Sequence, residues 1–238
     1  MNTLEQHKKQ VNDALLFTGK VGFTNAENLQ LVANRKRRGF PTQLVNLGLL
    51  LSRKMAGGNL IFGLSKMGAD TIGVKQFDIH KLTLGRVEHA LTAQAVTLVA
   101  IKDLGVVDYE FEPQNISRDT RPDVIWIFDD GSKLYIEIEL SAKSISDGDM
   151  DRFFMKLLSR NTLVVFRDQT LYSRYIMQTR KYIETGIPEW TRINGKWVKF
   201  DAFVKFDRDE WDNIEFQLYK EGVSTKLSLI FEAIGFGY

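Results

Sequence analysis

Hydrophobic residues in the first 80 positions recur first at helical spacing and then in short apolar runs. Val11, Leu15 and Leu16 would share one face of a helix, and Pro41 is a residue type favoured in a helix's first turn. The pattern predicts helices at 5–18, at 25–33 and from Pro41, then strands at 49–54 and 59–64. Three helices followed by a hairpin that contains glycines at its tip predict a winged helix-turn-helix domain in residues 1–80.

The rest of the chain alternates between helical and strand periodicity. Val87, Leu91 and Ala95 recur at helical spacing and predict a long helix over 84–104. After it, the pattern predicts strands at 109–112, 121–128 and 133–144, a helix at 150–160, a strand at 162–166, a helix at 171–185 and a hairpin around Asn194 and Gly195. We therefore expect an α/β (α+β) protein with a second domain in residues 81–238.

Two of these strands, 121–128 and 133–144, carry the candidate chemistry. Asp130-Gly131 between them is typical of a hairpin with a type I′ turn, so the strands should pair antiparallel. Side chains alternate along a strand, so Glu137 and Glu139 share one face, and Asp123 of the preceding strand can approach them. Three converging carboxylates are ligands that Mg²⁺ prefers.

A simpler interpretation is that Glu137 and Glu139 form the solvent-facing side of an amphipathic strand. Two observations favour a site. Like charges two residues apart on one face of a strand repel unless a cation or solvent relieves them. The second observation is a resemblance to known proteins.

Arg121-Pro122-Asp123 followed by the run from Glu137 to Ser144, EIELSAKS, resembles the PD-(D/E)XK nuclease superfamily. The pattern is more similar to replication-relaxation proteins and MobC-type plasmid mobilization relaxases, which have a winged-helix N-terminus, a helix with a histidine, RPD and E-x-E-L-S-x-K-S in that order. His89 matches the helical histidine, and the resemblance covers most of residues 11–166. Glu139 stands where the superfamily has lysine, as in some restriction nucleases, and Lys143 follows four residues later.

The resemblance implies a PD-(D/E)XK nuclease-like domain that nicks DNA at a plasmid transfer origin within a relaxosome, with accessory and coupling proteins as partners. Asp123, Glu137 and Glu139 would bind Mg²⁺ or Mn²⁺, with Glu139 as either ligand or base, and His89 and Lys143 would assist. The main alternative is a site-specific DNA-binding regulator of plasmid replication or of the relaxosome, with an inactive nuclease-like domain; a more distant one is a restriction-type or repair nuclease with the same fold.

Charge is distributed unevenly along the chain. Residues 1–80 contain 11 Lys and Arg against 5 Asp and Glu, whereas residues 81–238 contain 21 against 25. A basic segment suits DNA docking. The residues expected at DNA are Arg35, Lys36, Arg37, Arg38, Arg53 and Lys54 at phosphates, and Thr42, Gln43 and Asn46 at base edges. A solvated run of charges remains the alternative for residues 35–38.

Composition excludes several other classes. The chain has no cysteine, so disulfides and zinc-thiolate sites are excluded. Its three histidines, His7, His80 and His89, do not form the cluster that a tyrosine relaxase needs, so we expect hydrolysis without a covalent protein–DNA adduct. We find no signal peptide or membrane-spanning run, and expect a cytoplasmic protein without membrane insertion; homodimer formation is left open. The aromatic residues of the last third of the chain are expected in the core and not on a surface that stacks bases: Trp190, Trp197, Trp211, Phe203 and Tyr219.

Overall fold

The computed structural model shows a mixed α+β protein that divides into two compact units, Met1–Gly105 and Val106–Tyr238. It describes residues 3–35, 39–56, 58–117, 119–219 and 224–226. The expected boundary after residue 80 differs from the one between the two units, because the helix at 84–103 packs with the first unit. Each unit is therefore described by itself.

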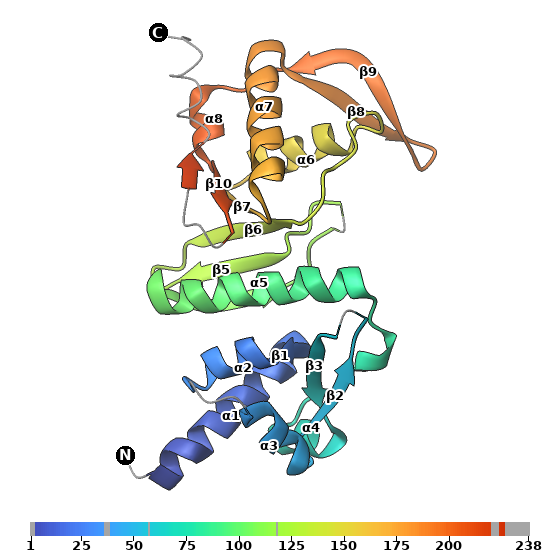
Figure 1. The fold of residues 1–238 in the computed structure, drawn as a ribbon. Helices are drawn as coiled ribbons and strands as arrows, with labels where there is room; N and C mark the ends of the chain where they lie inside the picture. The colour runs from blue at the N-terminus through green and yellow to red at the C-terminus, as the bar shows by residue number, and fades with distance from the viewer. Residues whose placement is uncertain (1–2, 36–38, 57, 118, 220–223, 227–238) are drawn as a thin grey trace. The chain divides into compact units, whose positions relative to one another are not determined.

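The first unit contains the three helices and the hairpin that its hydrophobic pattern predicts (Figure 1). Its elements are α1 (Thr3–Val21), β1 (Phe23–Asn25), α2 (Ala26–Val32), α3 (Phe40–Asn46), β2 (Leu50–Lys54), β3 (Leu60–Leu64), α4 (Lys66–Ile72), the 3-10 helix η1 (Ile79–Lys81) and α5 (Leu84–Asp103). The unexpected β1 pairs antiparallel with β3, which gives a three-stranded sheet in the order β1-β3-β2. Leu15, Leu29, Leu44 and Phe62 bring α1, α2, α3 and the sheet into one core.

Two buried amide side chains attach α5 to this unit. Gln94 of α5 donates a hydrogen bond to the Phe23 carbonyl at 2.8 Å, and Asn28 of α2 donates to Gln94 Oε1 at 3.2 Å. Both amides are about 1% exposed. The apolar periodicity of residues 84–104 predicted the helix. It could not show that the polar residue Gln94 is buried and hydrogen-bonded to the rest of the unit.

The second unit is built on a six-stranded sheet in the order β11-β10-β7-β6-β5-β4. Its elements are β4 (Val106–Phe111), β5 (Val124–Phe128), β6 (Lys133–Glu139), α6 (Asp149–Leu158), β7 (Thr162–Phe166), α7 (Gln169–Thr185), β8 (Ile187–Ile193), β9 (Lys196–Val204), α8 (Arg208–Asp212), β10 (Ile214–Leu218) and β11 (Ser224–Lys226). Strands β4, β5 and β6 are antiparallel neighbours, whereas β6, β7 and β10 run parallel. The order of three strands, a helix and a strand agrees with the prediction; α8, β10 and β11 were not predicted.

The β5–β6 hairpin is present, with Ile127 opposite Lys133, but its turn is not type I′. Of the two central residues proposed, only Gly131 has a positive φ, of 79°. The loop is longer than a two-residue turn, and the Asp130 carboxylate accepts a hydrogen bond from the Ser132 amide at 2.8 Å, so a left-handed Asp130 is not required.

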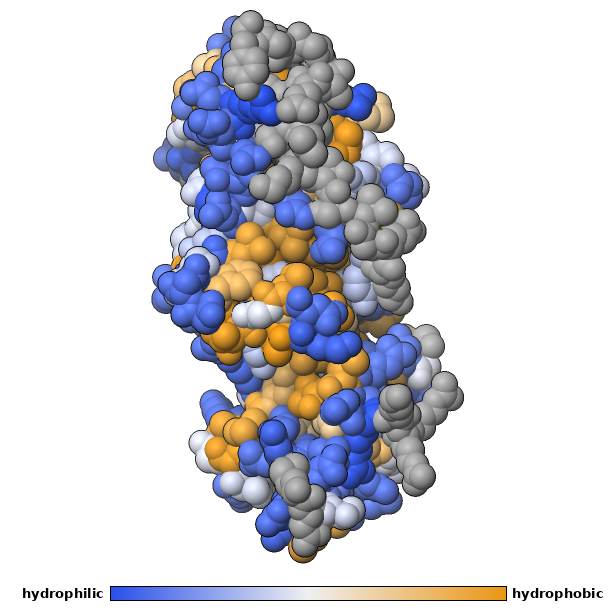
Figure 2. Space-filling view, turned by 90° about the vertical axis from the view of Figure 1, so that its left-hand side faces the viewer, coloured by the Kyte–Doolittle hydropathy of each residue, from blue (hydrophilic) through white to orange (hydrophobic). Residues whose placement is uncertain are grey.

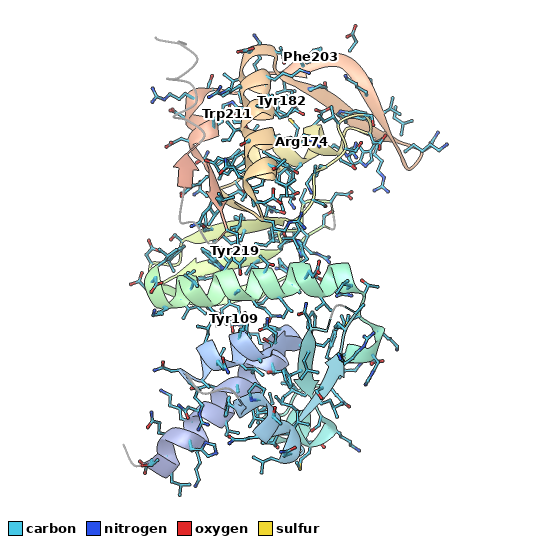
Figure 3. All side chains as sticks on the ribbon, in the orientation of Figure 1. Tyr109, Arg174, Tyr182, Phe203, Trp211 and Tyr219 are labelled. Carbon is cyan, nitrogen blue, oxygen red and sulfur yellow. The ribbon has the colours of Figure 1, made fainter. Side chains whose placement is uncertain are left out.

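Aromatic side chains fill the core beneath α6 and α7, which lie on the same side of the sheet (Figure 1). Phe154 of α6 contacts Tyr182 of α7 and Trp211 of α8 at ring-centre distances of 5.0 and 6.0 Å. Figure 3 labels Tyr182 and Trp211. The prediction that Trp197 and Phe203 lie in the core is wrong, since they are 38% and 53% exposed on the separate two-stranded ribbon β8–β9, whereas Trp211 is buried as predicted. Trp190 on the same ribbon is only partly buried.

Candidate functional site

Asp123 lies immediately before β5 and is fixed by the backbone of β6. Its amide donates to the Ile136 carbonyl at 3.1 Å, and its Oδ2 accepts from the Ile138 amide at 2.7 Å. Because Val124 is paired with Ile136, the antiparallel register places Asp123 opposite Glu137. The hairpin therefore brings these two carboxylates to neighbouring strands, as the sequence predicted.

Glu137 and Glu139 are buried, with exposures of 4% and 5%. Their face of β6 is covered by side chains from α6, from α7 and from the loop after β6. The alternative of a solvent-facing strand is therefore wrong. Carboxylates at this depth require partners, because an isolated buried charge is strongly unfavourable.

Two cations supply the partners of Glu137. Lys156 Nζ lies 2.6 Å and Arg160 NH2 lies 3.0 Å from the same oxygen, Oε1. Both cations are also held by backbone carbonyls of the segment before β5: Lys156 donates to Arg121 at 2.7 Å, and Arg160 donates to Thr120 at 2.7 Å. The pair thus connects the end of α6 to both strands of the hairpin.

Glu139 has a second set of partners. Lys143 Nζ lies 2.8 Å from its Oε1, and the Tyr175 hydroxyl donates to its Oε2 at 2.9 Å. Lys143 also lies 4.4 Å from the centre of the Phe153 ring, a cation–π contact. β6 ends at Glu139, so Lys143 reaches this carboxylate from the following loop and not from a continued strand.

Burial changes the protonation of both glutamates. It raises the pKa of Glu137 to about 7, with a further increase from the nearby charge of Asp123, while Lys156 opposes the shift. Burial also raises the pKa of Glu139, and Lys143 opposes this. The charge of Asp123 therefore acts on both glutamates, and the pKa of Glu137 is raised to about 7.

The donor chemistry of this cluster fits a hard divalent cation, since all the candidate ligands are carboxylate oxygens. The ammonium of Lys156 already places a positive charge 2.6 Å from Glu137 Oε1. In the described part of the chain, however, no three His, Cys, Asp or Glu side chains already stand as a ligand set. Asp123 and Glu137 would hold a divalent ion, which would compete with Lys156 for the Glu137 carboxylate.

The structure brings together four of the five residues proposed for catalysis: Asp123, Glu137, Glu139 and Lys143. The fifth, His89, lies on α5 in the other unit. Two residues of the cluster, Arg160 and Tyr175, were not predicted, and Lys156 was expected, with Arg152, to guide DNA into the site or to lie on a solvated helix face, not to pair with Glu137. Arg160 lies after the last residue of α6, Leu158, so helical spacing carried no signal for it, and the tyrosine had none either.

The polar face of α3 is the candidate DNA surface of the first unit. Thr42, Gln43 and Asn46 are all exposed, while Leu44 between them is fully buried. Lys54 at the end of β2 is also exposed. These four side chains have the accessibility that contact with DNA requires.

Two other proposed DNA-binding residues have partners within the first unit. The Arg35 guanidinium contacts His7 at 2.6 Å and Gln10 at 2.7 Å, which connects it to α1. Arg53 donates to the carbonyls of Ile79 at 2.6 Å and Leu82 at 3.2 Å. Lys36, Arg37 and Arg38 lie outside the described residues, so their DNA-binding assignment stays a prediction.

The molecular surface and the comparisons with known proteins do not assign a function to the site. Hydrophilic residues are interspersed with hydrophobic areas on the face shown in Figure 2. Among the described residues, no helix is both long and apolar enough to cross a bilayer. No family model, no curated protein and no solved structure matches the chain.

Proposed function

We propose that this protein is a metal-dependent DNA nickase of the MobC-type relaxase kind, which acts at a plasmid transfer origin. The observation that carries the proposal is the cluster of the buried Glu137 and Glu139 with the partly buried Asp123, with lysines at its edge. A phosphodiester nuclease needs carboxylates for a divalent ion and cations for the phosphate, and both types of group are present here.

The arrangement of elements supports the two finer fold assignments. In the first unit, α1, α2 and α3 precede the β2–β3 hairpin, which is the element order of a winged helix-turn-helix with α3 as its recognition helix. In the second unit, β4-β5-β6-α6-β7 has the order of the PD-(D/E)XK core, with the proposed site on β5 and β6.

The roles of the residues follow from their positions. Asp123 and Glu137 would hold Mg²⁺ or Mn²⁺, which supplies charge stabilisation of the phosphate and a more acidic water. The superfamily has a lysine at the position of Glu139. In this protein Lys156 of α6 would supply that ammonium group beside Glu137. Burial raises the pKa of Glu139, which makes it a better proton acceptor than an exposed carboxylate, and Tyr175 and Lys143 fix its orientation.

A second function is favoured by one specific observation. Lys156 and Arg160 already neutralise Glu137, and Lys143 neutralises Glu139, so the cluster is stabilised by the protein's own cations. Such a network is also what a purely structural site would have. The second candidate is therefore a DNA-binding regulator of plasmid replication or of the relaxosome whose nuclease-like unit is inactive.

Nicking of supercoiled plasmid carrying the transfer origin distinguishes the two functions. The nickase predicts open-circular product in Mg²⁺ or Mn²⁺, its loss in Asp123→Ala and Glu137→Ala, and full activity in the control Glu110→Ala, which changes an exposed residue of β4. The regulator predicts no product in either metal while origin DNA is still bound. Denaturing gels of labelled DNA should show free ends, and a labelled band at the mass of the protein would contradict hydrolysis.

DNA binding by the first unit is tested separately. Alanine at Thr42, Gln43 and Asn46 should reduce the preference for origin DNA over unrelated duplex, because these side chains would read base edges. Alanine at residues 35–38 should instead flatten the salt dependence, by about one unit of log–log slope for each phosphate that the protein no longer neutralises. Unchanged affinity of both variants over a range of salt concentrations would contradict the assignment of this unit to DNA binding.

A further inference from the structure

One face of the β8–β9 ribbon alternates aromatic and basic side chains. Trp190 is paired with Lys199, and Arg192 is paired with Trp197. Directly opposed residues of an antiparallel pair lie on the same face, and residues two apart on a strand share that face. Trp190, Arg192, Trp197 and Lys199 therefore form one surface of the ribbon.

The two tryptophans differ in how firmly they are held. Trp190 Nε1 donates to the buried Asp151 carboxylate at 2.8 Å, and its ring packs on Gly148, where an added Cβ would lie 2.2 Å away. Trp197 is 38% exposed. The guanidinium of Arg152 lies 5.4 Å from the Trp190 ring and 4.7 Å from the Trp197 ring. Trp190 is thus a fixed support, and Trp197 offers an accessible ring surface.

A cavity of about 660 Å³ lies between this ribbon and α6. Its volume is within the range of small-molecule sites, about 300–1,000 Å³. The two tryptophans of the ribbon and Arg152 and Lys156 of α6 contribute to its wall. Lys143 and Lys156 both line the cavity and also contact the carboxylate cluster, so the cavity adjoins the candidate catalytic site.

The charges around the cavity largely compensate one another. Three lining cations, Lys143, Arg152 and Lys156, are matched by the lining acids Asp119, Asp149 and Glu189. Two of these acids are ion-paired, Asp149 with Arg152 and Asp119 with Arg192 at 3.3 Å. A polyanion held mainly by charge is therefore a poor fit. A ligand with an aromatic ring and one or two phosphates fits better.

We propose that this cavity holds one nucleotide of a DNA single strand beside the carboxylate cluster. The base stacks on Trp197, and the adjoining phosphate contacts Lys143 and Lys156. Every base has a ring face that can stack on an aromatic side chain, so this site accepts any nucleotide. The first unit would then select the DNA sequence. The inference rests on the proposed nickase function for the choice of DNA as ligand, and it defines the substrate as a locally unpaired strand.

The test is fluorescence anisotropy with the full-length protein and a labelled oligothymidylate of about eight nucleotides. Trp197→Ala should weaken binding about 5- to 100-fold, the range for loss of one base–aromatic stack. Trp197→Phe, which keeps a ring, should recover part of the affinity. The control Phe200→Ala removes a similarly exposed aromatic of the same strand, at 43%, that does not line the cavity, and should bind normally.

Two results would overturn the proposal: equal affinity of wild type and Trp197→Ala, or equal weakening by Trp197→Ala and Phe200→Ala. The salt dependence adds a further condition. With one or two phosphate contacts the log–log slope should be no steeper than about −1.5, and a much steeper slope would show binding by charge at another surface.

Nicking measured on the same preparations separates this inference from the proposed function. If binding depends on Trp197 but neither metal gives nicking, the nucleotide site is supported and the nickase function is contradicted. If the protein nicks DNA but no binding depends on Trp197, the nickase function is supported and the nucleotide site is contradicted.

Discussion

Substituting Glu137 with glutamine should change how the stability of the second unit depends on pH. Burial, followed by the charge of Asp123, raises the Glu137 pKa from its ordinary value of 4.5 to about 7. A carboxyl whose folded pKa lies above its unfolded pKa favours the folded state when protonated. Its contribution is complete below pH 4.5 and is lost as the pH rises through 7.

The magnitude follows from the shift. Two and a half pKa units correspond to about 3 kcal/mol of free energy of unfolding at 1.36 kcal/mol for each unit. Glutamine does not titrate, so the stability of wild type relative to Glu137→Gln should fall by about 3 kcal/mol between about pH 4 and pH 8. The constant effect of leaving Lys156 and Arg160 without their carboxylate cancels, because only the change with pH is compared.

Urea unfolding followed by tryptophan fluorescence is the appropriate assay. All four tryptophans, at positions 126, 190, 197 and 211, lie in the second unit, so the signal reports that unit alone. Glu110→Gln, which changes an exposed residue of β4, is the matched control and should give a curve parallel to wild type. If the Glu137→Gln curve were parallel too, the reasoning about its buried charge would be refuted.

Three further predictions concern the same unit. Tyr175→Phe should lower the free energy of unfolding by about 1–3 kcal/mol in the urea assay, because the buried Glu139 loses a donor at 2.9 Å; no decrease would mean that water replaces the hydroxyl. Gly148→Ala should cost at least about 1 kcal/mol and alter tryptophan emission, since the new methyl would overlap Trp190 and φ is 70°; wild-type emission would contradict that packing. Mn²⁺ at about a hundredfold its dissociation constant should stabilise wild type at pH 8 by about 2.7 kcal/mol and leave Asp123→Ala unchanged; equal stabilisation of both would place the ion elsewhere.

The predicted elements came from local periodicity, and that is why most of them were found. Helices α1, α5, α6 and α7 have apolar residues at helical spacing, and the β5–β6 hairpin has a glycine turn. Strand β10 was missed although Ile214, Phe216 and Leu218 alternate along it, because a run of five residues next to a short helix carries a weak signal. Its place beside β7 depends on a parallel pairing between segments far apart in the chain, which no local pattern encodes.

The expected domain boundary after residue 80 differs from the division between the two compact units for a related reason. The hydrophobic pattern of residues 84–104 shows that a helix forms but not which partner it covers. The structure shows α5 packed on the first unit through Val87 and through Gln94 and Asn28, two polar residues whose burial becomes evident only when their mutual hydrogen bond is seen. Sequence patterns identify polar residues as surface by default, and buried amide pairs are the exception to that rule.

The sequence predicted the carboxylates of the candidate site but not the cations that pair with them. Alternation along β6 was enough to place Glu137 and Glu139 together, but their cations come from α6 and from the loop after β6. These cations stabilise the buried carboxylates, and a divalent ion at Glu137 would have to share or replace them. It follows that a variant with a weakened Lys156–Glu137 ion pair should have a lower free energy of unfolding in the absence of metal and a higher affinity for Mn²⁺. A site that evolved only for stability would show the first effect without the second, so the two measured together distinguish the nickase from the inactive regulator.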